Sequence, residues 1–187
     1  ALVGAGTLNS YYYGPFRHYS TTNAYSNRNQ YIYTAAELQA SGFVSGGKIS
    51  SLEMFVTSVG TGVGDLEVKI GCTSLDKFLK YGDFVNTGLS TVRNPAPFTP
   101  VAGWNTFTFH NGYMWDGTSN IIIEFCRNNA TAGTTSAVQS HNLGYYSTLY
   151  QSQFGSGICG GTATGETYLR PNIRFNWCEA AAITYSW

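Results

Sequence analysis

The alternation that predicts the fold is clearest in Asp65-Leu66-Glu67-Val68-Lys69-Ile70-Gly71-Cys72-Thr73. Every second side chain from the second residue onward is apolar: Leu66, Val68, Ile70 and Cys72. The charged side chains of Glu67 and Lys69 alternate with them. A period of two is that of an extended chain with one face turned to a core and the other to solvent. The segment therefore predicts a half-buried β-strand.

Further strands are predicted on both sides of this segment. Their ranges are Tyr11–Tyr13, Tyr31–Tyr33, Ile49–Val59, Thr106–Phe109, Ile121–Cys126, Ser147–Tyr150, Asn172–Trp177 and Ala182–Trp187. The same alternation in Ile49–Val59 places three side chains on one face: Leu52, Met54 and Val56. The near-continuous apolar run Ile121–Cys126 is typical of a central strand.

One short helix is predicted among these strands. Thr34 and Glu37 have the spacing of a capping box, and the helical turn covers residues 35–40. The glycine-rich stretch Gly60–Gly64 joins two predicted strands and is interpreted as a hairpin connection, because a phosphate-binding loop would precede a helix. The pattern predicts an all-β fold, a two-sheet antiparallel sandwich or jelly roll with one short helical turn.

The chain of 187 residues is expected to hold one folded domain. Residues 1–13 belong to a stretch rich in Gly, Ser and Tyr and are predicted to form an extended N-terminal arm or edge strand. Residues 14–178 are predicted to form the β-sandwich domain, and residues 179–187 a C-terminal tail or strand.

Charge and hydrophobicity together exclude two classes of partner. Charged residues make up 11% of the chain, against roughly 25% in an average protein, and ten basic residues balance ten acidic ones. No basic footprint for nucleic acid is present. No apolar stretch approaches the ~20 residues that span a bilayer, so no membrane insertion is expected.

No catalytic motif is found in the sequence. The three histidines do not have ligand spacings and are interpreted as packed or surface residues: His18, His110 and His141. No GxSxG nucleophile motif occurs. Three glutamates in predicted strands are expected at outward or rim positions: Glu53, Glu67 and Glu124. We therefore predict that the chain is not an enzyme. A hydrolase would need two carboxyl groups about 5 to 10 Å apart in one groove.

A single loop offers oxygen ligands for a metal. Asp116 and Asn120 could provide part of a calcium shell. The favoured alternative is an Asx turn, in which the aspartate side chain binds its own backbone. No other cofactor is expected.

The cysteines indicate the redox compartment. There are four, Cys72, Cys126, Cys159 and Cys178, and none forms a CxxC pair. An even number in a chain of low charge favours two disulfides in an oxidising compartment over four free thiols. Their positions alone allow three connectivities.

Clustered tyrosines form the candidate surface for a partner or ligand. The residues are Tyr11, Tyr12 and Tyr13, then Tyr145, Tyr146 and Tyr150, with Trp187 at the end of the chain. A tyrosine is apolar along its ring and polar at its tip, which suits an interface. Ordinary sheet surface is the alternative interpretation.

Several segments in this order resemble a known type of domain. They are Gln30–Leu38, Gly47–Leu52, Val68–Gly71, Pro100–Asn105, Trp115–Ile121 and Arg170–Phe175. Over roughly residues 11–176 the chain resembles a β-sandwich repeat domain of secreted and surface proteins of the Bacteroidetes, which are typically exported by the type IX secretion system. The resemblance implies an adhesin-like module without a shared set of catalytic residues.

The resemblance also implies a disulfide pairing. Similar domains have a cysteine after the central strand and another in a late glycine-rich loop, which match Cys126 and Cys159. The two additional cysteines, Cys72 and Cys178, are then expected to pair with each other.

Two functions are consistent with these observations. The first is a non-catalytic structural or adhesive module outside the cell or on its surface, such as a filament or surface-layer subunit. Its strand-like termini, residues 1–13 and Ala182–Trp187, would add to a sheet edge of another copy or of a neighbouring surface-protein domain. The alternative is a carbohydrate-binding module of a secreted protein. An exposed, roughly planar group of Tyr or Trp beside polar side chains would favour the alternative.

Overall fold

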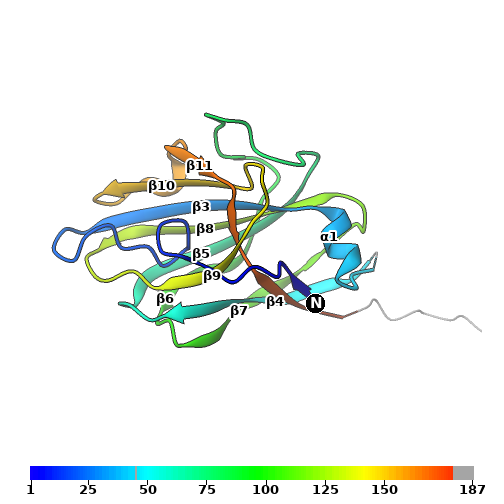
Figure 1. Ribbon diagram of the computed structural model, residues 1–187, viewed down its shortest axis with the longest axis horizontal. Helices are drawn as coiled ribbons and strands as arrows, with labels where there is room; N and C mark the ends of the chain where they lie inside the picture. The colour runs from blue at the N-terminus through cyan, green and yellow to red at the C-terminus, as the bar shows by residue number, and fades with distance from the viewer. Residues whose placement is uncertain (45, 179–187) are drawn as a thin grey trace, which may run out of the picture.

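The computed structural model describes residues 1–44 and 46–178, and in it two antiparallel β-sheets pack face to face (Figure 1). The predicted all-β, two-sheet sandwich is confirmed. The predicted tail at residues 179–187, with the strand at 182–187 and Trp187, lies outside the described residues.

Each sheet is assembled from strands that are distant in sequence. Within the described residues the first sheet consists of β1 (Leu2–Val3), β2 (Leu8–Ser10), β4 (Lys48–Ser58), β7 (Gly103–Met114), β9 (Ala137–Asn142), β12 (Leu169–Pro171) and β13 (Ile173–Cys178). In that same part of the chain the second sheet has the order β11 (Gly165–Thr167), β10 (Thr148–Phe154), β3 (Tyr25–Tyr33), β8 (Asn120–Thr131), β5 (Val63–Thr73) and β6 (Ser90–Phe98). In the first sheet β4 pairs with β13, β9 and β7.

Alternation along the strands produces the core between the sheets. The predicted inward residues of β4 and β5 are buried: Leu52, Met54, Val56, Leu66, Val68 and Ile70. Aromatic side chains from both sheets pack among them: Tyr31, Tyr33, Phe107, Phe125 and Phe175. Burying a large apolar side chain of this kind contributes about 1.5 to 3 kcal/mol, so this cluster is the main source of stability.

The predicted central strand is confirmed. β8 lies between β3 and β5 and is buried on both faces. Ile121 and Ile123 face the core, while Ile122 joins a second cluster on the outer face. Phe78 and Phe84 of the segment 74–89 cover that outer face, which explains why the apolar run is continuous rather than alternating.

The predicted helix is α1 (Ala35–Ala40), and its capping box is present. Thr34 Oγ1 accepts from the Glu37 backbone N–H at 3.3 Å, and a Glu37 carboxylate oxygen accepts from the Thr34 N–H at 2.9 Å. Buried Arg170 binds the same carboxylate at 2.6 Å and so ties α1 to β12. A short 3-10 turn, η1 (Ile158–Gly160), precedes β11.

The N-terminal arm belongs to the first sheet. Leu2 of β1 pairs with Arg174 of β13, and Leu8 of β2 pairs with Ser140 of β9. The chain runs along this sheet to the far end of the sandwich before it enters β3 (Figure 1). Two short stretches of residues 1–13, Leu2–Val3 and Leu8–Ser10, thus pair with strands of their own domain.

Two local expectations were wrong. The strand predicted at Tyr11–Tyr13 ends earlier, because the Ser10 side chain accepts from the Tyr13 N–H and turns the chain. The stretch Gly60–Gly64 is a crossover between the sheets instead of a hairpin, since β4 and β5 lie in different sheets. A side chain on Gly60 would collide with the Thr134 backbone.

Candidate binding site

Two groups of aromatic side chains, bridged by Arg17, form a row where the segment 11–25 meets β10. This aromatic row is defined by Tyr150, Tyr13, Tyr12, Tyr19, Tyr25 and Phe154. Ring centroids are 5.0 Å apart for Tyr13 and Tyr150, and 4.7 Å apart for Tyr19 and Tyr25. These distances are those of packed aromatic pairs.

Strand pairing sets one side of the row. Tyr25 of β3 is directly opposite Phe154 of β10, and their centroids are 5.7 Å apart. Tyr150 and Phe154 are four residues apart on one strand and therefore face the same way.

Buried polar side chains hold the segment 11–25 over this face of β3. Tyr31 Oη donates to the Tyr13 carbonyl at 2.8 Å, and the Asn29 amide donates to the same oxygen at 3.3 Å. The Asn27 amide reaches the Gly14 carbonyl at 3.4 Å. These bonds use the backbone of the segment and leave its tyrosine rings at the surface. Tyr12 is 63% exposed, Tyr19 58% and Phe154 67%.

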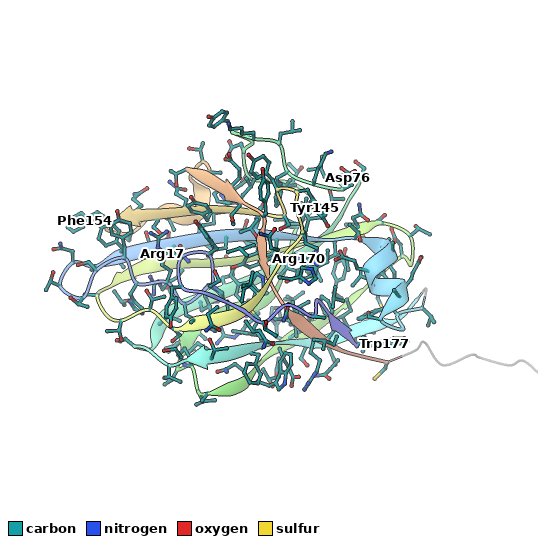
Figure 2. All side chains as sticks on the ribbon, viewed as in Figure 1. Arg17, Asp76, Tyr145, Phe154, Arg170 and Trp177 are labelled. Carbon is teal, nitrogen blue, oxygen red and sulfur yellow. A yellow bond between two sulfur atoms is a disulfide. The ribbon has the colours of Figure 1, made fainter. Side chains whose placement is uncertain are left out.

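Arg17 closes the gap between Tyr12 and Tyr19. Its guanidinium carbon lies 5.3 Å from the Tyr12 ring centroid and 4.9 Å from the Tyr19 centroid. One N–H group donates to the Tyr12 carbonyl at 3.3 Å. Figure 2 shows Arg17 toward the end of the sandwich at which Phe154 lies, whereas Trp177 lies at the opposite end.

A hollow of about 360 Å³ adjoins the row. This threonine hollow is lined by Tyr11, Tyr12, His18, Tyr19, Ser20, Thr21, Gly133, Thr134 and Thr135. Its volume is at the lower end of the range for small-molecule sites. Aromatic rings and hydroxyl groups line it together, an arrangement that can contact both an apolar face and polar substituents of one ligand.

The buried side chains of Arg127 and His18 lie next to the segment that borders the hollow. Arg127 donates to the carbonyls of Arg17 and Tyr25, at 2.8 and 3.0 Å. It thereby connects these two positions of the segment 11–25. Burial lowers the pKa of Arg127 to about 10, so its guanidinium is still charged near neutral pH. Burial, followed by the Arg127 charge, lowers the pKa of His18 below its ordinary value. The His18 ring is therefore neutral near neutral pH.

The predicted tyrosine surface is divided by the fold. Tyr11, Tyr12, Tyr13 and Tyr150 come together at the row or the hollow. Tyr145 instead lies beside Arg170 (Figure 2), and Tyr146 stacks with Tyr168 at 4.6 Å.

The sequence reasoning missed other members of the site: Arg17, Tyr19, Tyr25 and Phe154. Two signals could have found some of them. Arg17 and Tyr19 lie in the same tyrosine-rich stretch, and Phe154 follows Tyr150 at strand spacing.

A second hollow of about 380 Å³ lies beneath the arm, between residues 2–5 and α1. Its lining includes Glu37 and His141 but no tyrosine, tryptophan or phenylalanine among the described residues. It lacks the aromatic surface found at the threonine hollow.

The disulfide Cys126–Cys159 is present, with Cα atoms 5.8 Å apart. The expected Cys72–Cys178 bond is absent between these two described residues, and this expectation is corrected. The sulfur of Cys72, in β5 of the second sheet, accepts from Oη of Tyr113, in β7 of the first sheet, at 3.2 Å beside the core. Cys178 follows Trp177, which packs on the core, so strand alternation turns Cys178 to the outer face.

The loop with Asp116 and Asn120 is an Asx turn. The Asp116 carboxylate accepts from the backbone N–H groups of Thr118 and Ser119, at 2.9 and 2.8 Å. The hydrogen bond from the Ser119 hydroxyl, together with these backbone bonds, lowers the Asp116 pKa to about 2. The Asn120 oxygen accepts from the Ala35 N–H instead. Among the described residues, no group of three or more His, Cys, Asp or Glu could hold a metal ion.

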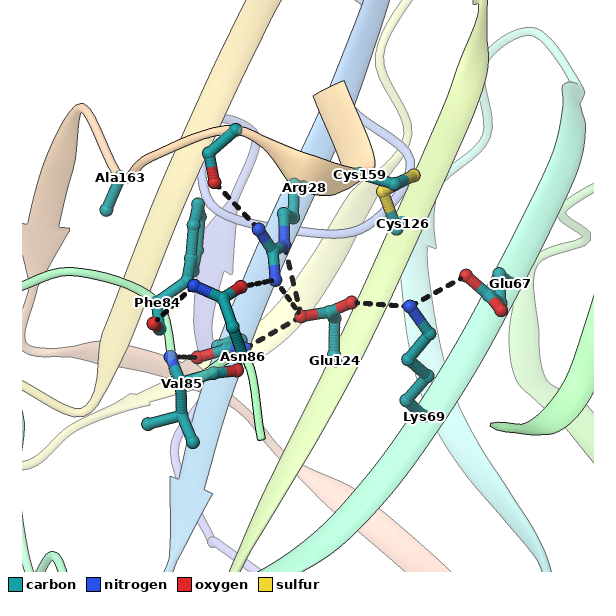
Figure 3. Close-up of polar contacts among 12 residues, drawn as sticks. Arg28, Glu67, Lys69, Phe84, Val85, Asn86, Glu124, Cys126, Cys159 and Ala163 are labelled. Carbon is teal, nitrogen blue, oxygen red and sulfur yellow. Dashed lines mark hydrogen bonds and ion pairs between the residues drawn. A yellow bond between two sulfur atoms is a disulfide. The ribbon is translucent and has the colours of Figure 1, made fainter. Parts of the chain in front are cut away.

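Glu124 lies on the outer face of the second sheet, as expected for an outward residue, but within a buried charge network (Figure 3). Glu124 is buried, and its carboxylate meets Arg28 at 2.7 Å and Lys69 at 3.4 Å. Lys69 also pairs with Glu67 at 3.2 Å. Arg28 completes the network through Asn86 and the Gly161 carbonyl, both at 2.8 Å. The network ties two loops to the sheet.

Comparison of the chain with family models, curated proteins and solved structures found no match. The resemblance to Bacteroidetes surface domains therefore rests on the sequence segments alone. In the part of the chain that the structure describes, no helix is long and apolar enough to cross a membrane.

Proposed function

We propose that this protein is a non-catalytic, extracellular adhesive module that binds a glycan along the aromatic row. One observation carries the proposal: the exposed rings of Tyr12 and Tyr19 stand beside the hydroxyl-lined threonine hollow. This is the arrangement that favours a carbohydrate-binding module over a purely structural one.

The chemistry of a sugar ring suits this surface. One face of a pyranose consists mainly of C–H groups and packs on an aromatic ring, while its hydroxyl groups seek hydrogen-bond partners at the edge. The row supplies the rings, and Ser20, Thr21, Thr134 and Thr135 supply hydroxyl groups. A glycan chain could pass from the hollow along the row toward Phe154.

The rings are held in place before a ligand arrives. Tyr31, Asn29 and Asn27 fix the backbone of the segment from below. Arg17 stacks against both Tyr12 and Tyr19. Less ordering is then required on binding, and this lowers the entropic cost of association.

An extracellular location is part of the proposal and is supported by the disulfide Cys126–Cys159, because disulfides persist in oxidising compartments. Assembly through a free N-terminal strand receives less support. β1 and β2 already pair with β13 and β9, so they would have to leave their own sheet first.

A polysaccharide panel tests the proposal. The purified chain is measured against neutral and acidic polymers by affinity electrophoresis, next to Tyr12→Ala/Tyr19→Ala. Each lost stacking contact is worth about 1 kcal/mol, so the double variant should bind about tenfold or more weakly.

The matched control is Tyr81→Ala, which removes an 84% exposed ring outside the row. It should bind like the original chain. If no polymer binds, or the double variant binds as well as the original, the proposal is wrong.

A further inference from the structure

The charge state of the site points to a narrower ligand class, and this step rests on the proposed function. We infer that the glycan is acidic and that a carboxylate or sulfate group on it binds Arg17.

Arg17 differs from the arginines that the fold uses for its own stability. Arg28, Arg170 and Arg174 each form an ion pair with a glutamate, at distances from 2.6 to 3.2 Å, and Arg93 and Arg127 each donate to two or more backbone carbonyls. Among residues 1–44 and 46–178, Arg17 has no carboxylate within ion-pair distance. Within this part of the chain it is a cation without an ion-pair partner, placed between two exposed tyrosines.

The hydrogen-bonding capacity of Arg17 is largely unused. An arginine carries five N–H donors in a planar fork, and in the described structure one polar contact, to the Tyr12 carbonyl, is formed. The guanidinium lies over the rings of Tyr12 and Tyr19, and these contacts do not use its N–H donors. A planar fork with open donors suits bidentate recognition of a carboxylate or sulfate.

No carboxylate of the described residues forms an ion pair with this cation. Arg127 donates to the Arg17 carbonyl, and Asp65 is the acidic group whose charge raises the pKa of Arg127. The charge of Glu166 raises the pKa of the Tyr150 hydroxyl, and the charge of Arg17 lowers it. Tyr150 lies at one end of the row. Among the described residues, no carboxylate lines the threonine hollow. The local field therefore favours an anion at Arg17.

The same polymer with and without its charge provides the test. Polygalacturonate and its fully methyl-esterified form have the same sugar backbone but differ in carboxylate charge. Dextran sulfate and dextran make the second pair and separate sulfate from carboxylate as the source of the anion. Dissociation constants are measured by isothermal titration or affinity electrophoresis at one fixed ionic strength.

We expect at least one charged polymer to bind tenfold or more tightly than its neutral partner. Arg17→Gln should reduce that ratio to within about twofold, and Arg17→Lys should leave an intermediate ratio because the fork is lost but the charge is kept. Lys80→Gln is the matched control. It removes an equal charge that lies 5.0 Å from the ring of exposed Tyr81, away from the hollow. It should leave the ratio unchanged.

The outcomes separate the two proposals. Equal binding of charged and neutral polymers, lost in Tyr12→Ala/Tyr19→Ala, would overturn the acidic ligand and leave the glycan site standing. A ratio that survives Arg17→Gln, or that falls equally in Lys80→Gln, would also overturn the role of Arg17. No binding of any polymer would overturn both proposals.

Discussion

Arg28 and Arg17 both stack on aromatic rings, but they lie in opposite environments. The Arg28 guanidinium is 4.2 Å from the Phe84 centroid, is 2% exposed, and binds Glu124, Asn86 and the Gly161 carbonyl. Arg17 is partly exposed and meets two tyrosine rings and one carbonyl. A stacked arginine whose donors are filled by its own chain stabilises the fold. One whose donors stay open is available to a ligand.

The same contrast extends to the regions around them. On the outer face of the second sheet, a disulfide and a charge network hold the segments 83–86 and 159–161 against the strands (Figure 3). Along the aromatic row, the internal bonds involve backbone atoms while the rings face solvent. Substitutions in the first region should therefore change stability, and substitutions in the second should change binding.

The largest effect is expected from Arg28→Met. It leaves the Glu124 carboxylate buried with Lys69 as its remaining ion-pair partner, and breaking one side of a buried ion pair costs about 3 to 5 kcal/mol. Urea denaturation measures the free energy of unfolding. Arg28→Met/Glu124→Leu should lose less free energy of unfolding than the single variant, because no uncompensated carboxylate is left. A single variant within 1 kcal/mol of the original chain would contradict the structural role of this pair.

The next effect concerns the cysteines. Replacing Cys126 and Cys159 with serine opens a loop with a sequence separation of 33 residues, which costs about 3 to 4 kcal/mol on the chain-entropy model. Cys72→Ser/Cys178→Ser should cost much less, because those residues are not bonded to each other. Equal losses in the two double variants, measured without reductant, would show that the second bond forms after all.

A smaller loss of stability is expected on acidification. The pKa of folded His18 lies below its ordinary value of 6.5, so the unfolded chain binds more protons in the window between the two values. Stability should therefore fall as the pH drops below about 6.5, by at most about 1.4 kcal/mol per pH unit for one proton. His18→Gln should remove this part of the slope in thermal melts at pH 7.5, 6.5 and 5.5. An unchanged slope in the variant would exclude His18 as the source.

The regular part of the fold could be predicted because it depends on local periodicity. The alternation in Ile49–Val59 and Asp65–Thr73 predicted the buried faces, and Thr34 with Glu37 predicted the start of α1. The burial of Glu124 was not predictable in this way. Its position faces away from the core, and it is buried because the irregular segment 74–89 folds back over the sheet.

The site was predictable only in part for the same reason. The tyrosine-rich stretch identified Tyr11, Tyr12 and Tyr13, but their meeting with Tyr150 depends on β10 pairing with β3. The open donors of Arg17 depend on which acidic side chains other parts of the chain bring close. Neither contact has a local signal in the sequence.

Hydrogen–deuterium exchange with and without the polysaccharide that binds best in the panel tests most directly whether the aromatic row is the binding surface. Bound glycan should slow exchange at residues 11–25 and 133–135, while residues 74–89 on the opposite face of the second sheet stay unchanged. Protection at 74–89, or an unchanged 11–25 segment under saturating glycan, would contradict the assignment of binding to the row.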